Sequence, residues 1–387
     1  MDIKMKKWSK ALLFILPLIC MVAAVNWYVD SYAYLRVTYD EIGRQMVVNS
    51  MNVTGLEESD FNDRSLLLAC LKQQEERKEL IVAGSSRVMN FDHTMFGTDS
   101  FYNTGLSEST IYDLLAVTGI LAKRGQLPEK MIIGVDAFLF NNSHNNERWK
   151  DLEDYVFYME GLLDEYAADA ANGQTAAVDD ATGKTHKKTA GADTGRQHSK
   201  WLSLDYFRYN ITLLPEHKRF LVDYTKDWET EQYLKHYDGS IAYQKSLREV
   251  AVEDVEELTR QSIDEHVVYR MTDFHQIDEE SMELLDRLTG YLQGQGVEVI
   301  LYLPPYSPMM YNYIESEEQY QITFQIEERI RQMASENGAP LYGSYDPEGC
   351  GLEMTDLYDI YHVKTEKMPD TFYPVTGTKG ALKSGEE

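Results

Sequence analysis

Residues 79–87 read ELIVAGSSR, a short apolar run that stops at Gly84 and continues into Ser85-Ser86-Arg87. A run of this length that ends at a glycine is typical of a parallel strand buried on both faces. A serine after such a strand exposes its hydroxyl, and its backbone N–H is available to bind an oxyanion. The alternative is an ordinary turn in which a serine caps a helix. The stretch therefore predicts the first strand of an α/β sheet and a candidate nucleophile, Ser86.

Four further apolar runs have the length of buried strands, at residues 100–103, 130–136, 297–303 and 340–345. Amphipathic helices are predicted between them, at residues 107–124, 279–292 and 315–337. Alternating strands and helices predict a doubly wound parallel sheet of about five strands. Such sheets bind ligands at the carboxyl ends of their strands, so the residues directly after each strand are the candidates for a site.

The composition excludes some function classes. The chain has 387 residues and a formal net charge of −27, which argues against binding DNA or RNA. The same charge argues against holding a polyanionic polymer by bulk electrostatics. Three cysteines are too few for a disulfide scaffold, and no Cys/His cluster has the spacing of zinc ligands. The first strand–helix turn lacks the glycine patterns of nucleotide-binding folds, so no metal or cofactor is expected.

The N-terminus has the pattern of a membrane anchor. An uninterrupted apolar run covers residues 11–25 and is followed by Trp27 and Tyr28, which suit the membrane interface. The lysines before the run favour a cytoplasmic N-terminus and place the rest of the chain outside: Lys4, Lys6, Lys7 and Lys10. A cleaved signal peptide and a buried helix remain the alternatives.

The rest of the chain divides around the sheet. Residues 1–30 are predicted to form the anchor and residues 31–78 a helical juxtamembrane segment. The α/β domain is expected over residues 79–370, with an insertion at 141–278 that forms a lid or subdomain. Two parts have few large apolar residues, and we expect a disordered loop and a frayed tail there: residues 167–200 and 371–387.

The second and last strands are also followed by residues of catalytic type. Asn103-Thr104-Gly105 follows the second strand, and a glycine there can offer a second N–H to an oxyanion. Asp359 and His362 follow the last strand in a D-x-x-H spacing, which lets one turn present a carboxylate and an imidazole to the same place. Both motifs are also compatible with a plain turn. Asp273 and His275 form a second candidate acid–base pair, which is less favoured because it precedes the fourth strand.

Together these blocks resemble the SGNH/GDSL hydrolase superfamily, through Gly84-Ser85-Ser86, Gly105 and Asp359 with His362. The resemblance implies a flavodoxin-like sheet over residues 79–140 and 279–365. It also implies that Ser86 is the nucleophile, His362 the general base and Asp359 its orienting carboxylate. The N–H groups of Ser86 and Gly105 would then be oxyanion donors.

The third block departs from the family. Most members carry Gly-x-Asn-Asp, whose asparagine completes the oxyanion hole, whereas this chain has Gly134-Val135-Asp136-Ala137. An ionised Asp136 cannot donate a hydrogen bond to an oxyanion. Either the hole has two donors, or a residue such as Asn103, Asn141 or Asn142 substitutes, or activity is low.

Within the superfamily the chain is similar to anchored cell-envelope members, including the D-alanyl-transfer protein of teichoic acid modification and alginate O-acetyltransferase-like proteins. The resemblance implies an extracytoplasmic acyl hydrolase or O-acyltransferase that acts on a cell-surface polysaccharide. It also implies a membrane-bound O-acyltransferase as partner. The alternative is a non-catalytic glycan-binding or scaffold protein with the same fold, which the altered third block favours.

Four residues near these blocks are expected to bind substrate: Arg87, Asp136, Asp238 and Tyr306. Arg87 follows the nucleophile and suits a phosphate or a sugar carboxylate, although such an arginine more often pairs with a nearby carboxylate. Asp238, in the insertion, and Tyr306, after the fourth strand, lie in aromatic-rich stretches that either line a sugar cleft or belong to the core.

Overall fold

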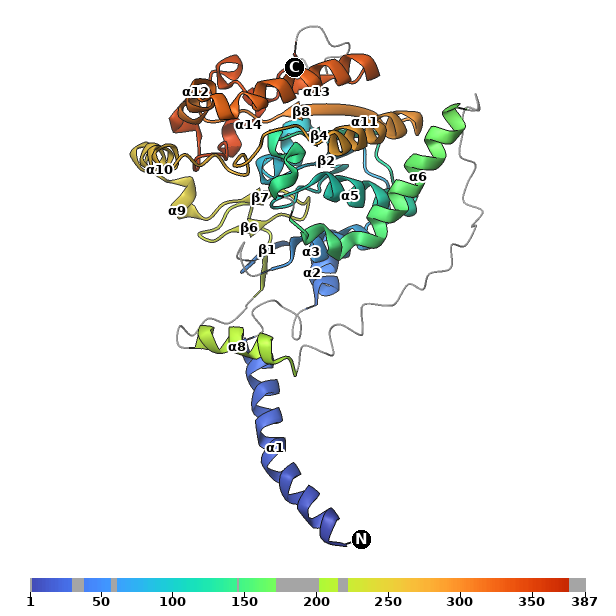
Figure 1. Cartoon of the computed structure of the whole chain (residues 1–387), viewed down its shortest axis with the longest axis vertical. Helices are drawn as coiled ribbons and strands as arrows, with labels where there is room; N and C mark the ends of the chain where they lie inside the picture. The colour runs from blue at the N-terminus through green and yellow to red at the C-terminus, as the bar shows by residue number, and fades with distance from the viewer. Residues whose placement is uncertain are drawn as a thin grey trace.

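The computed structural model describes residues 2–29, 38–56, 61–144, 146–171, 202–214 and 222–375, with the side chains of residues 2–14, 144, 171 and 213 excepted. Five strands form one parallel sheet in the order β3-β2-β4-β8-β9 (Figure 1). Relative to their order along the chain this is 2-1-3-4-5, a doubly wound order. All five predicted strands are confirmed: β2 (Leu80–Ala83), β3 (Phe101–Asn103), β4 (Lys130–Gly134), β8 (Glu298–Leu303) and β9 (Leu341–Gly343).

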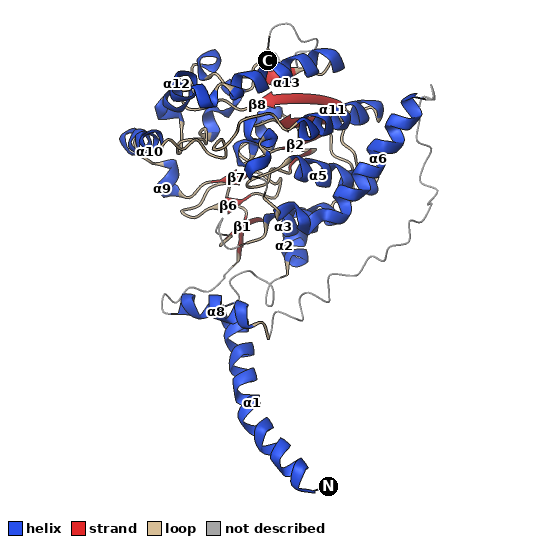
Figure 2. Cartoon of the chain, viewed as in Figure 1, coloured by secondary structure: helices blue, strands red, loops and turns tan. Residues whose placement is uncertain are grey.

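The strands are buried on both faces, which explains why their sequences are apolar without alternation. Successive side chains of a strand point to opposite faces of the sheet. Ile81 and Met131 therefore belong to the larger hydrophobic cluster, whereas Val82 and Ile132 belong to a second cluster on the other face. Figure 2 shows the helices gathered around these strands.

The predicted helices are present with shifted bounds. They are α5 (Ile111–Lys123), α11 (Glu279–Gly294) and, in place of one helix over 315–337, α12 (Pro308–Ser316) and α13 (Ile322–Asn337). The helix α5 begins later than predicted because the Asp113 carboxylate accepts the Thr110 N–H at 2.8 Å and caps the helix there. In the insertion, α6 (Glu153–Ala171) packs on α5 at Gly119, where a Cβ would collide with the backbone of Tyr155.

A second, antiparallel sheet joins the insertion to the segment before the α/β domain. Its order is β5-β1-β6-β7, and β1 comes from the segment predicted to be juxtamembrane. That segment also contains the helices α2 and α3, whose side chains enter the larger hydrophobic cluster, so it is built into the domain. The bounds are α2 (Tyr39–Val47), β1 (Asn52–Thr54), α3 (Asp63–Gln73), β5 (Asp223–Thr225), β6 (Leu234–Lys235) and β7 (Ile241–Ala242). The insertion also carries α9 (Lys245–Arg248) and α10 (Val252–Asp264).

Part of the predicted tail is ordered along the sheet. After α14 (Met368–Thr371), Tyr373 O accepts the Gly343 N–H at 2.8 Å and Val375 donates to Leu341 O at 2.9 Å. The Phe372 ring stacks on Tyr342 with centroids 4.3 Å apart. The prediction of fraying is therefore wrong for residues 371–375, while residues 376–387 and the predicted loop at 172–200 lie outside the described residues.

The N-terminal helix α1 (Asp2–Val29) contains the predicted anchor and contacts α8 (Leu204–Leu213) of the insertion (Figure 1). Asn26 Nδ2 donates to Ser203 O at 3.1 Å, and Asn210 Nδ2 donates to Asn26 Oδ1 at 3.2 Å. Among the residues whose side chains are described, no helix combines the length and apolar composition needed to cross a membrane. Residues 11–14 of the predicted apolar run lie outside that set.

A buried ionic network holds the loop after β3. The Arg64 guanidinium is 1% exposed and donates to both oxygens of Asp113 at 2.9 Å. It also donates to Asp63 at 2.9 Å and to Ser107 O at 3.0 Å, while Ser107 N–H donates to Asp63 at 2.8 Å. Because a buried guanidinium needs such partners, the network fixes the position of Ser107 relative to α3.

Replacement of Asp113 by alanine leaves the Arg64 charge without its bidentate partner and removes the cap of α5. We expect the free energy of unfolding to fall by about 3–5 kcal/mol. Urea unfolding followed by circular dichroism measures this. In the control, Glu41→Ala breaks the exposed pair with Arg44 and should leave the midpoint unchanged. Equal midpoints for the two variants would contradict the role given to Asp113.

Candidate active site

The predicted nucleophile lies at a sharp turn after β2. Gly84 has φ +150°, and a Cβ there would press on Val88 and Gly134, so the turn requires glycine. The Ser85 hydroxyl accepts the Arg87 N–H at 3.2 Å and caps the short helix η1 (Ser86–Val88). Ser86 is therefore the first residue of η1, where its N–H has no acceptor within the helix.

The structure brings Ser86, His362 and Asp359 into one hydrogen-bonded chain. Ser86 Oγ lies 2.8 Å from His362 Nε2, and His362 Nδ1 lies 2.8 Å from Asp359 Oδ2. The turn caps itself, because Asp359 Oδ1 accepts the N–H groups of Tyr361 at 2.8 Å and His362 at 2.9 Å. Residues 276 positions apart in sequence thus meet at the carboxyl ends of the strands, as their positions after the first and last strands predicted.

The surroundings keep Asp359 ionised. Burial alone would raise its pKa, but the facing His362 imidazole and the N–H groups of Tyr361 and His362 together lower the pKa below its usual value. An ionised carboxylate at Nδ1 favours the tautomer in which Nδ1 carries the proton. Nε2 is then free to accept the proton of the Ser86 hydroxyl.

The predicted substrate ligand Asp136 serves a different purpose. Its side chain is fully buried, accepts the Ser85 hydroxyl at 2.6 Å and forms an ion pair with Arg87 at 2.8 Å. Arg87 also donates to Pro304 O at 2.9 Å and to Pro305 O. The substrate-binding prediction for Asp136 is corrected because both oxygens are occupied by the protein. For Arg87, the alternative of pairing with a nearby carboxylate is the one observed.

The donors expected to replace the family asparagine have other partners. Asn103 donates through its side-chain amide to Val88 O at 2.7 Å and Phe91 O at 2.9 Å. Its Oδ1 accepts the Gly105 N–H at 2.8 Å, which also takes Gly105 from the expected oxyanion hole. Asn141 donates to Arg270 O at 2.8 Å, and the Asn142 side chain is exposed. Among the described residues, the Ser86 N–H makes no hydrogen bond and remains available to an oxyanion, and the exposed Asn142 side chain has no partner that holds it at the site.

A cavity of about 330 Å³ opens beside the Ser86 hydroxyl. Predicted residues Ser86, Arg87, His362 and Tyr306 line it, and the Arg87 guanidinium lies 4.8 Å from the centre of the Tyr306 ring. Six lining residues were not predicted from the sequence: Ser107, Glu108, Phe138, Arg148, Tyr269 and Tyr361. Tyr361 lies within the D-x-x-H block, and Phe138 lies four residues beyond β4. Their positions after strands could therefore have identified these two as candidate site residues.

Two residues, one that lines this cavity and one that follows the lining residue Tyr269, have left-handed backbones. Glu108, which lines it, has φ +54°, and Arg270 has φ +57°. Their side chains form an ion pair at 3.2 Å. Left-handed backbone is costly for residues other than glycine and is often found at functional sites, where tertiary contacts maintain it.

Asp238 does not line the cavity and is corrected as a substrate ligand. Its carboxylate accepts the Ser240 hydroxyl at 2.6 Å and pairs with His93 Nδ1 at 2.9 Å. Its carbonyl accepts the Asn103 N–H at 2.7 Å, and a Cβ on the neighbouring Gly239 would collide with Asn103 O. The Asp238 turn therefore packs against the edge of β3 and holds the backbone of Asn103 in place.

The His93–Asp238 pair predicts a pH dependence of stability. The hydrogen bond to Asp238 raises the pKa of His93 above its usual value of 6.5. The charged pair therefore stabilises the fold fully below that value, and its contribution is lost as the pH rises through the pKa of folded His93. The difference in free energy of unfolding between wild type and His93→Gln should shrink from about pH 6 to about pH 9. A difference independent of pH in urea titrations would contradict this role.

Asp136→Asn introduces the asparagine that the family carries, but in this structure it leaves the buried Arg87 without a counter-charge. We expect a loss of about 3 kcal/mol in the free energy of unfolding and no gain in reactivity of Ser86. Urea unfolding and the rate of fluorophosphonate labelling measure the two effects. Asp264→Asn, at an exposed position on α10, is the control. Faster labelling without loss of stability would contradict the pairing role of Asp136.

Comparisons with known proteins give no information on the chemistry of this site. Comparison of the sequence with protein-family models and with curated proteins gave no match. In the described part of the chain, no three His, Cys, Asp or Glu side chains are placed to hold a metal ion.

Proposed function

We propose that the chain is an SGNH-type serine enzyme that transfers or hydrolyses an O-linked acyl group through an acyl-Ser86 intermediate. The observation that carries the proposal is the hydrogen-bonded chain from Ser86 through His362 to Asp359. Its members follow the first and last strands of a 2-1-3-4-5 sheet, in agreement with the block order of that superfamily. The same geometry is the general arrangement of a nucleophile, a base and an orienting carboxylate.

The chemistry proceeds in two halves. Ser86 Oγ attacks the ester carbonyl while its proton passes to His362 Nε2, and the oxyanion that forms accepts the Ser86 N–H. When the ester C–O bond breaks, the proton on Nε2 passes to the departing alcohol and leaves an acyl-serine. Water or a sugar hydroxyl then attacks the acyl carbon and loses its proton to His362 Nε2. The bond between the acyl carbon and Ser86 Oγ breaks, and the proton on Nε2 returns to Ser86 Oγ. The choice between water and a sugar hydroxyl separates hydrolysis from transfer.

The cavity supports an acylated sugar as substrate. Four aromatic side chains line it, namely Phe138, Tyr269, Tyr306 and Tyr361. Aromatic faces pack well against the C–H groups of a sugar ring or an acyl chain, and the serines and arginines around them supply polar contacts. We take the substrate to be an O-acylated polysaccharide of the cell envelope.

The N-terminal helix supports a location at the membrane. Exposed apolar side chains cover the described part of α1: Ile15, Leu16, Leu18, Ile19, Met21, Trp27 and Tyr28. An exposed apolar surface of this kind marks a partner or a membrane, and the aromatic pair at its end suits the interface. In the proposal, α1 anchors the enzyme with the α/β domain outside, beside a membrane-bound O-acyltransferase that supplies acyl groups.

One observation favours the alternative of a non-catalytic glycan-binding or scaffold partner. The Gly105 N–H and the Asn103 amide, which the resemblance and the sequence suggested as oxyanion donors, are both used within the protein. A hole with the Ser86 N–H alone stabilises an oxyanion less than one with three donors, since each donor contributes about 10²–10³-fold in rate.

A fluorophosphonate probe tests the proposal on the full-length chain. We expect wild type to be labelled at Ser86, as located by mass spectrometry, because His362 removes the hydroxyl proton. Ser86→Ala should lose labelling entirely. Ser335→Ala, an exposed serine on α13, is the matched control and should be labelled like wild type.

Asp359→Asn refines the same test, since it keeps the hydrogen-bond geometry but favours the wrong tautomer of His362. Its labelling rate should fall by about 10³–10⁴-fold. Labelling that persists in Ser86→Ala would move the nucleophile elsewhere. Absence of labelling in folded wild type would contradict the proposal of a serine enzyme and favour the non-catalytic scaffold protein.

A further inference from the structure

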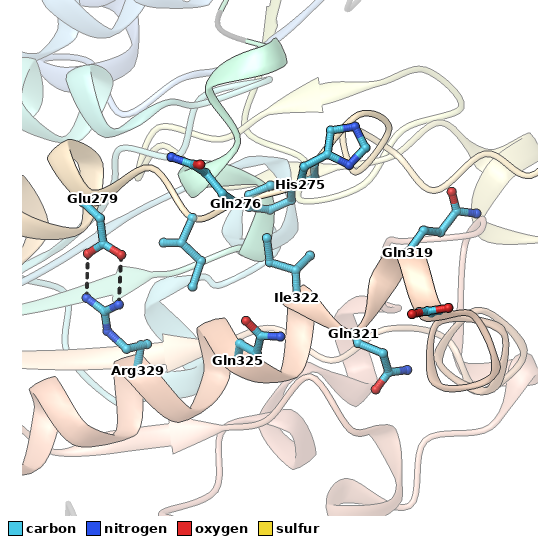
Figure 3. Close-up of a pocket in the computed structure, with 11 residues that line it drawn as sticks. His275, Gln276, Glu279, Gln319, Gln321, Ile322, Gln325 and Arg329 are labelled. Atoms are coloured by element: carbon cyan, nitrogen blue, oxygen red, sulfur yellow. Dashed lines mark hydrogen bonds and ion pairs between the residues drawn. The ribbon is translucent and has the colours of Figure 1, made fainter.

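A second and larger cavity, the glutamine groove, lies between the segment before α11 and the beginning of α13 (Figure 3). Its volume is about 500 Å³. Four glutamines line it. Gln321 donates its amide to the backbone carbonyls of Ile314, Glu315 and Glu317. The other three make no such bond: Gln276 from the segment before α11, Gln319 from the turn before α13, and Gln325 from α13 itself. The groove shares no lining residue with the cavity beside Ser86.

The three amides are available to a ligand. Among the residues drawn in Figure 3, the interaction lines join only Glu279 and Arg329, and the side chains of the three glutamines make no hydrogen bond within the described part of the chain. Each amide offers both a carbonyl acceptor and an N–H₂ donor. Sugar hydroxyls also donate and accept, so an amide-lined groove is complementary to a hydroxyl-rich chain.

The charges in the groove disfavour an ionic ligand. Glu279 and Arg329 form a two-point ion pair with distances of 3.1 and 2.8 Å, so each neutralises the other. Glu318 adds a negative charge to the lining, which opposes binding of an anionic chain. The pair also links α11 to α13 at the surface of the groove.

The floor of the groove is apolar. Ile322 and Phe274 are 7% and 4% exposed and line the groove beneath its polar rim. Apolar and aromatic groups pack against the C–H faces of sugars, while polar groups at the rim fix their orientation. A polar rim over an apolar floor suits a sugar better than it suits a free ion.

One segment connects the groove to the cavity beside Ser86. Tyr269 lines the catalytic cavity, and Phe274, five residues later, lines the groove. Even a fully extended chain places their Cα atoms at most about 18 Å apart. A ligand of a few sugar units therefore has the length needed to span this separation.

We propose that the glutamine groove is a second subsite that binds an uncharged, hydroxyl-rich segment of the polysaccharide while another unit of the same chain enters the cavity beside Ser86. The proposal rests on the proposed function for the identity of the polymer. It assigns polymer recognition to the groove and acyl chemistry to the cavity. Binding energy gained in the groove then holds the reacting unit near Ser86.

Isothermal titration of the full-length chain in detergent tests the groove. The probes are hexasaccharides of β-1,4-linked glucose and of β-1,4-linked N-acetylglucosamine. We expect wild type to bind at least one probe, and Gln276→Ala/Gln325→Ala to raise its Kd about tenfold through the loss of two hydrogen bonds. The matched control is Gln261→Ala/Gln332→Ala, because these glutamines lie on α10 and α13, outside the groove, and bond to neighbouring glutamates.

The outcomes separate the groove from the catalytic proposal. Equal Kd values in the two double variants would contradict the proposal that the groove binds sugar. Failure of wild type to bind either hexasaccharide would contradict it as well. Binding of a Gly-Ser repeat peptide in preference to both sugars would assign the groove to a protein partner and overturn it as well. Fluorophosphonate labelling of Ser86 should be equal in all variants. If wild type is not labelled but still binds sugar through the glutamines, the proposal of an acyl-Ser86 enzyme is wrong and the proposal of a sugar-binding groove is retained.

Discussion

The buried ion pair between Arg87 and Asp136 is the interaction on which the arrangement of the strand ends depends. Arg87 follows β2, Asp136 follows β4, and Arg87 also donates to the carbonyls of Pro304 and Pro305 after β8. A guanidinium removed from water is tolerated only when such partners surround it. The loops after three adjacent strands are therefore held together, and the backbone of Ser86, between Ser85 and Arg87, is held with them.

The same pairing has a consequence for the chemistry. The position at which the resemblance to the SGNH superfamily predicts an oxyanion-binding asparagine is occupied by the Asp136 carboxylate, which holds Ser85 and Arg87. The Gly105 N–H donates to Asn103 Oδ1, and the Asn103 amide donates to Phe91 O, so neither group replaces that asparagine. The site thus has a complete route for proton transfer through His362 and few donors for a developing negative charge. In the proposed reaction, stabilisation of the oxyanion would then fall mainly to the Ser86 N–H.

The tertiary structure places two separate cavities on the molecule, to which the proposals assign chemistry and polymer recognition. The cavity beside Ser86 is small and aromatic, whereas the groove along α13 is larger and lined by amides. The segment between α10 and α11 touches both, through Tyr269 and Phe274. That segment belongs to the insertion, which also completes the second sheet with β1 and covers the edge of β3 through the Asp238 turn. The insertion is therefore part of the frame around the site and more than a lid.

The sequence by itself determined the five-stranded sheet and the meeting of Ser86, Asp359 and His362. Strands buried on both faces are continuous apolar runs, and residues that follow parallel strands converge at one edge whatever lies between them. Only the tertiary structure decided the roles of Asp136, Asn103 and Asp238, and brought β1 into a sheet with strands of the insertion. A side chain's partners depend on which distant backbone groups are nearby, and neither a three-residue strand nor a lone carboxylate carries that information in its own sequence.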